Sequence, residues 1–204
     1  MVLFMKMLKN AFLIGLLRVD KKVSENFNKS WPEDYIELHI SRILVLLYLA
    51  GEGIRQKKIK SRTKLAKLDF FLRYPHYLKE AAKILKYEKP ISLKPLSLPF
   101  EPSMIRYFYG PWDEKYYQII LYLQARNLIN ISNDASGTDI FMLTQLGESI
   151  AKTLIGKKSF KNLATAATIV GELFVNYSGN KLKNFIYENF PEVVSIPLKH
   201  KIEV

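Results

Sequence analysis

The side chains that could do chemistry are few, and their spacing does not bring them together into a reactive group. The chain has three histidines, His39, His76 and His200, and no cysteine. No histidine stands at metal-ligand spacing from another histidine or a carboxylate. The lack of cysteine excludes disulfides, thiolate metal sites and cysteine nucleophiles. We therefore expect no catalytic residue, no metal, no cofactor and no small-molecule substrate.

The acidic residues are better explained by structure than by catalysis. Asp113 and Glu114 are adjacent, so on a helix they point in different directions, and negative charge suits a helix N-terminus. Asp69 lies among apolar residues, four positions before Arg73, which predicts an ion pair on a helix. The alternative for Asp69 and Arg73 is contact with a partner protein. The glycines at 51–53 lack the lysine and spacing of a phosphate-binding loop. The sequence thus predicts a protein that is not an enzyme.

A dense basic run is the strongest nucleic-acid signal. Seven of the thirteen residues from 55 to 67 are Lys or Arg and none is acidic. The net charge of +12 also favours an anionic partner. Such a cluster would contact DNA phosphates without reading the base sequence. The alternative is a solvated loop that keeps the protein soluble. The DNA-binding candidates are Arg55, Lys57, Lys58, Lys60, Arg62, Lys64 and Lys67.

A second group of candidates suits contact with another protein. Aromatic residues gather between 107 and 122, a composition typical of protein interfaces, although most of these rings are expected in the core. Trp112 and Tyr122 are the best placed to anchor a partner. Together with the ion pair described above, the partner-binding candidates are Asp69, Arg73, Tyr107, Tyr109, Trp112, Tyr116 and Tyr122.

The elements that position these residues follow from residues 104–147. Alternating side chains predict a strand over 104–109, which Gly110 and Pro111 end, and helical spacing of apolar residues predicts a helix over 112–127. Two short apolar runs flank turn residues at 133–137 and predict a β-hairpin, and Thr144 is expected to cap a further helix. Strand, helix and hairpin in this order are typical of a winged helix.

The remainder of the chain is expected to be helical. Helices are predicted from Ser30, a cap with Glu33 three residues later, to about residue 50, then over 62–73 up to Pro75, and over 76–87. Residues 88–103 carry four prolines and predict an ordered loop. Further helices are predicted near 145–155, 160–177 and 181–190, before a frayed tail.

The resulting architecture is mainly α with a small β wing. We expect an N-terminal extension over 1–30, a winged-helix domain over 31–147 and a C-terminal helical association element over 148–204. The apolar run at 11–17 is too short to cross a bilayer and is not followed by a small-residue cleavage signature, so we expect a cytoplasmic protein without membrane contact.

Four segments together carry a family resemblance. They are KLAKLDFFLRYP (64–75), MIRYFYGPWDEKYYQIILYLQARNLINI (104–131), FMLTQLGESIAKTL (141–154) and KLKNFIYENFPEVVSIPL (181–198). They resemble the middle component of bacterial ABC-three-component systems, which include Lamassu-type anti-phage defence. The resemblance implies a non-catalytic subunit that bridges or regulates an SMC-like ABC ATPase and an effector, often a nuclease. Double-stranded DNA is a further expected partner, reached through the complex.

Two other functions remain open from the residues. The wing and the net charge also suit a stand-alone winged-helix transcription regulator, although acidic residues at the start of the 112–127 helix oppose reading of the major groove by that helix. A weaker resemblance to the Panacea antitoxin domain suits an inhibitor that restrains a toxic partner.

Overall fold

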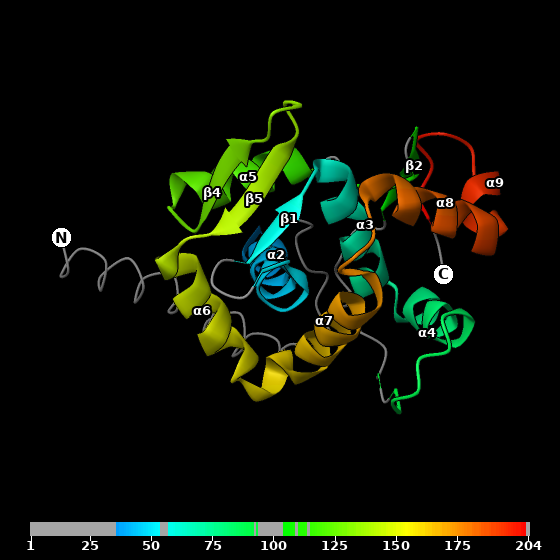
Figure 1. Ribbon diagram of the computed structural model, residues 1–204, viewed down its shortest axis with the longest axis horizontal. Coiled ribbons are helices and arrows are strands. Elements are labelled where there is room, and N and C mark those ends of the chain that lie inside the picture. Colours follow the sequence, from blue (N-terminus) through cyan, green and yellow to red (C-terminus); the bar gives the residue numbers. More distant parts are fainter. Residues whose placement is uncertain are drawn as a thin grey trace, which may run out of the picture.

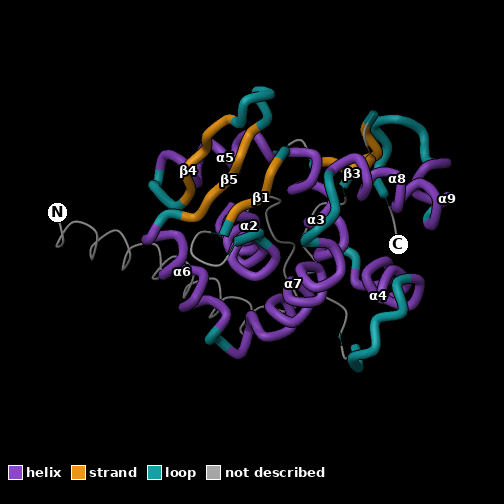
Figure 2. The backbone as a smooth tube through the Cα atoms, in the orientation of Figure 1, coloured by secondary structure: helices purple, strands orange, loops and turns teal. Residues whose placement is uncertain are grey.

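The protein is mostly helical and carries two small antiparallel sheets, as the computed structural model in Figures 1 and 2 shows. The structure describes residues 36–53, 57–91, 93, 104–108, 110–113 and 115–202. The expected extension over 1–30, the cap at Ser30, most of the proline-rich segment and the side chains of Arg55, Tyr109 and Glu114 lie outside these residues.

The helices agree well with the periodicity of the sequence. They are α2 (Ile36–Ala50), α3 (Arg62–Arg73), α4 (Pro75–Ile84), α5 (Tyr116–Ala125), α6 (Gln145–Ile155), α7 (Lys161–Phe174), α8 (Gly179–Asn189) and α9 (Pro191–Ser195). A short 3₁₀ helix, Lys158–Phe160, precedes α7. The predictions over 62–73 and near 145–155 are confirmed, and so is the Thr144 cap, whose side chain accepts a hydrogen bond from Gly147 N.

Helix α2 is the centre of the fold. Figure 1 shows it nearly end-on, with the larger sheet on one side and α6 and α7 on another, and it also contacts α3 and α5. Because neighbours surround it, burial extends beyond an apolar stripe to His39, Ser41 and Arg42. Helix α7 crosses it closely at Gly171, where an added Cβ would lie 2.8 Å from Leu49 O. Any larger residue there would push the two helices apart.

The larger sheet has the strand order β1-β5-β4. Its hairpin of β4 (Ile129–Asn133) and β5 (Asp139–Leu143) confirms the predicted β-hairpin. Strand β1 (Lys58–Lys60) lies in the basic run, in the stretch before the helix over 62–73 where the residues predict a loop. Ile59 is fully buried and pairs with Phe141, while Lys58 and Lys60 face solvent. Three residues give too little alternation for a strand to be recognised from the sequence.

The smaller sheet corrects the prediction for residues 104–115. Strand β2 (Ile105–Tyr107) is shorter than expected, and Gly110 and Pro111 do not end the sheet. They belong to a second strand, β3 (Gly110–Trp112), which pairs antiparallel with β2. Gly110 adopts a φ of 101°, which permits the tight reversal. Helix α5 therefore begins at Tyr116, four residues later than the predicted start at 112.

The C-terminal segment packs on the fold through Ile202, the last described residue, which corrects the expectation of a frayed tail for the residues up to that point. Ile202 is fully buried and its backbone N donates to Met104 O, while Lys201 bridges to Ile105. Helices α6 to α9 also contribute to the same hydrophobic core as α2 and α3: the rings of Phe71 and Phe174 stack with their centroids 4.5 Å apart.

No helix within the described ranges is both long and apolar enough to span a membrane.

Candidate functional site

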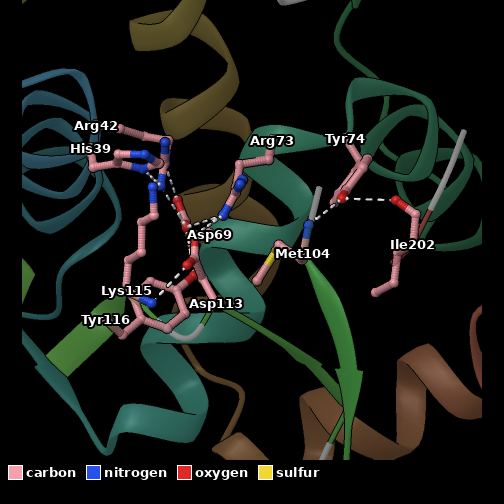
Figure 3. A network of polar contacts seen from close by, with 10 residues as sticks. All are labelled: His39, Arg42, Asp69, Arg73, Tyr74, Met104, Asp113, Lys115, Tyr116 and Ile202. Carbon is pink, nitrogen blue, oxygen red and sulfur yellow. Dashed lines mark hydrogen bonds and ion pairs between the residues drawn. The ribbon is translucent and has the colours of Figure 1, made fainter. Parts of the chain in front are cut away.

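A buried charge network joins three helices beneath the predicted partner surface (Figure 3). Asp69 on α3 is fully buried and accepts two hydrogen bonds from Arg42 on α2, at 2.6 Å from Nε and 3.2 Å from Nη2. The same carboxylate accepts a 2.5 Å hydrogen bond from the Tyr116 hydroxyl on α5. One buried carboxylate thus fixes α2, α3 and α5 relative to each other.

A second ion pair extends this network to the loop before α5. Arg73 Nη1 lies 2.6 Å from Asp113 Oδ2, and the other Asp113 oxygen accepts a 2.9 Å hydrogen bond from Lys115 N. The predicted pair of Asp69 and Arg73 is confirmed but long, at 3.9 Å. Asp113 is therefore neutralised by a buried guanidinium. Because Asp113 precedes α5 and is paired with Arg73, its charge does not support the expected repulsion of DNA phosphates; Glu114 lies outside the described residues.

The surroundings of the buried network favour one protonation state for each of His39, Asp113 and Tyr116. Burial, with Arg42 adding to it, lowers the pKa of His39 to about 4, so the imidazole is neutral at pH 7. Its Nδ1 lies 3.1 Å from Arg42 Nη2. Burial acts to raise the pKa of Asp113, but Arg73, the Lys115 N–H and Arg42 together outweigh it, and the pKa is lowered. Burial and the Asp69 carboxylate raise the pKa of Tyr116 well above its ordinary value. Neutral hydrogen-bonding rings and paired charges suit a structural role.

These positions correct part of the predicted partner surface. Asp69, Arg73 and Tyr116 are all buried within the chain, so a partner cannot touch them without the core opening. Tyr107, Trp112 and Tyr122 remain partly accessible. Arg126 covers the Tyr122 ring at 5.0 Å from its centroid.

The basic run is divided among three environments. Lys64 and Lys67 are buried, at 3% and 2% exposed, and cannot reach DNA. Lys60 and Arg62 are exposed but pair with carboxylates of the β4–β5 hairpin, each at 2.5 Å, Lys60 with Asp134 and Arg62 with Asp139. Lys57 is partly exposed just before β1, and Lys58 is exposed on β1 itself. The expected cluster is thus smaller than the sequence suggests.

A cavity of about 730 Å³ lies where the N-termini of α3 and α8 approach each other, and its lining includes Lys60 and Lys64. Several of the polar groups that line it already have partners. Lys64 Nζ donates to Glu52 and, at 2.7 Å, to Val175 O. Ser61 and Ser178 accept from the backbone N–H groups of Lys64 and Lys181. The Lys64 ammonium is therefore committed to the fold.

An exposed apolar face on α5 is absent from the sequence-based candidates. Tyr117 is 54% exposed and Leu121, four residues later, is 65% exposed. They lie on the same side of α5, opposite Ile119 and Leu123, which are buried. One feature of the sequence could have indicated this face, because α5 carries more apolar residues than a single buried stripe needs.

The described residues contain no group of three or more His, Asp or Glu side chains placed to hold a metal ion. Comparison with protein-family models, curated proteins and solved structures finds no match to this chain.

Proposed function

We propose that this protein is a non-catalytic winged-helix subunit that assembles with other proteins through the exposed face of α5. The element order supports the winged-helix assignment: α2, β1, α3, α5, β4 and β5 follow the order helix, strand, helix, helix, strand, strand, with β1 paired to the last strand. On this assignment α4 and the β2–β3 hairpin are an insertion between the second and third helices, and β4–β5 is the wing.

The observation that carries the proposal is the character of α5, which occupies the place of the recognition helix. Its exposed positions include Tyr117, Gln118, Leu121 and Gln124, and none of the residues within its bounds is Lys or Arg. A DNA-reading helix presents polar and basic groups to the major groove. Exposed aromatic and aliphatic side chains instead favour burial against a protein.

The resemblance of segments 64–75, 104–131, 141–154 and 181–198 supports a proposal for the complex in which the chain acts. We propose the middle component of a cytoplasmic anti-phage defence assembly of the Lamassu type, which bridges or regulates an SMC-like ABC ATPase and an effector such as a nuclease. Co-expression of the tagged chain with its neighbouring genes tests this. Recovery of an ATPase in stoichiometric amount is expected; recovery of the chain alone, as monomer or homodimer, would contradict the proposal.

A second role as an ancillary DNA contact is favoured by the position of Lys58. It projects from β1, the edge strand beside the wing, and Lys57 precedes it. Contact from an edge strand would reach the phosphate backbone rather than base edges. We propose weak, salt-sensitive binding to double-stranded DNA within the assembled complex, without sequence readout.

A further inference from the structure

A second cavity, of about 480 Å³, lies between the start of α3, the β2–β3 hairpin and α5. Aromatic rings form much of its wall. Trp112 lies between two other lining rings, with centroid distances of 6.3 Å to Tyr107 and 5.9 Å to Tyr117. Such walls are suited to a flat, apolar ligand.

One charged side chain, Lys67, also lines this cavity although it is only 2% exposed. Its amine lies against the backbone of Gly110, where an added Cβ would be 3.5 Å from Nζ. A larger residue there would touch the amine at ordinary van der Waals distance, and it would be strained by the φ of 101°. Within the part of the chain that the structure describes, Nζ makes no hydrogen bond and no ion pair.

Three other buried cations in the described residues each have a carboxylate partner. Arg42 pairs with Asp69, Arg73 with Asp113, and Lys64 with Glu52. Lys67 instead has another cation, Lys183, as a neighbour. Burial is the larger cause and Lys183 the smaller cause that lower the pKa of Lys67 to about 7. A buried ammonium without a counter-ion destabilises a fold, and an apolar side chain of similar size would not. An anion entering the cavity would remove that cost.

We infer that this cavity binds a small carboxylic acid with a planar apolar body, its carboxylate on Lys67 Nζ and its body among Tyr107, Trp112 and Tyr117. A singly charged group suits the site because Lys67 is the one cation there without a carboxylate partner among the described residues. The other lining cation, Arg62, is paired with Asp139 and has its guanidinium 5.5 Å from the centre of the Tyr117 ring. The pocket shares Tyr117 with the α5 face proposed above, but its binding test needs only the isolated chain.

The fluorescence of Trp112 can report ligand binding in this cavity directly. The chain has two tryptophans, so a Trp31→Phe variant leaves Trp112 as the only tryptophan. In that background the full chain is titrated at pH 6.5 with naphthoate and, separately, with naphthamide, which has the same ring system without the charge. The same titrations are made with Lys67→Met and with Lys60→Met, which removes an exposed lysine outside this cavity.

Naphthoate is expected to quench the Trp112 fluorescence saturably and to bind at least about tenfold more tightly than naphthamide. Lys67→Met should lose a similar factor in naphthoate affinity, and Lys60→Met should lose none. Equal affinity for the two probes would overturn the inference, and so would unchanged naphthoate binding in Lys67→Met or no binding up to about 10 mM. Were Lys67→Met to misfold, the comparison of the two probes on the Trp31→Phe protein would still decide the question.

Discussion

Arg42 on α2 and Asp69 on α3 form a two-point ion pair inside the protein, with contacts of 2.6 Å and 3.2 Å. The Asp69 carboxylate also accepts a hydrogen bond from the hydroxyl of Tyr116, so the pair holds the first residue of α5 against α2 and α3. The exposed face of α5 therefore depends on charges buried beneath it.

Asp69→Asn should destabilise the protein by about 3–5 kcal/mol, because it leaves the buried Arg42 guanidinium without its counter-charge at nearly unchanged volume. Urea unfolding followed by circular dichroism measures the effect. The matched control is Asp139→Asn, which breaks the exposed pair with Arg62 and should cost less than about 1 kcal/mol. Equal losses in the two variants would show that the Asp69 pair contributes no more than a surface pair.

Stability should fall as the pH drops from 6.5 to 4, in part because of His39. Its folded-state pKa of about 4 lies below the ordinary 6.5, so in this window the unfolded chain binds the proton and the folded chain does not. The full contribution is about 3 kcal/mol and is present above pH 6.5. Thermal melts across this range should show a shallower slope in His39→Asn and an unchanged slope in His200→Asn, which alters an exposed histidine. Parallel slopes in all three proteins would exclude His39 as the cause.

Lys67→Met should stabilise the unliganded protein at pH 7 by about 1–3 kcal/mol, the usual cost of a buried polar group without a partner. The sign follows from the pKa of about 7, below the ordinary 10.5. The contribution of Lys67 to wild-type stability is most favourable above pH 10.5 and falls as the pH drops to 7, and the variant should lack this contribution.

The groups facing Lys67 are Arg62 on α3, Tyr107 on β2, Tyr117 on α5, and Lys183 and Tyr187 on α8. All of them are present in both proteins, so the difference between the two stability curves isolates Lys67. Destabilisation by Lys67→Met at pH 7 would show that the amine supports the fold rather than straining it.

Replacing Lys57, Lys58 and Lys60 with Gln should reduce the salt dependence of DNA binding by the assembled complex, because each lost phosphate contact lowers the logarithmic slope by about 1. Lys157, Lys158 and Lys161, which lie in and beside the 3₁₀ helix before α7, supply a control triple of equal charge away from β1. A slope unchanged by the β1 triple would exclude this strand from DNA contact.

The sequence was informative where local chemistry sets the structure. Helix α3 lies between Ser61 and Pro75, and the Thr144 cap uses neighbouring backbone, so both follow from short-range rules. The spacing of Asp69 and Arg73 likewise indicated their ion pair. The stronger partner of Asp69 is Arg42, which is twenty-seven residues away in the sequence, so this contact forms only in the tertiary fold.

The features that could not be predicted from the sequence also depend on tertiary contacts. Strands β1 and β3 have three residues each and exist because β5 and β2 pair with them. Pro111 belongs to a two-stranded sheet, where a missing N–H is tolerated at an edge. Lys64 and Lys67 read as surface charges beside Lys60, and only the packing of α8 against α3 shows that they are buried.

The central claim is that the exposed face of α5 joins this chain to its partners. A double variant, Tyr117→Asp with Leu121→Asp, is co-expressed with the neighbouring genes, alongside a control, Gln118→Asp with Gln124→Asp, which places the same charges at exposed polar positions of the same helix. Native mass spectrometry of the tagged material counts the subunits. The account predicts an intact complex for the control and free chain with unchanged melting temperature for the double variant; an intact complex in both would contradict it.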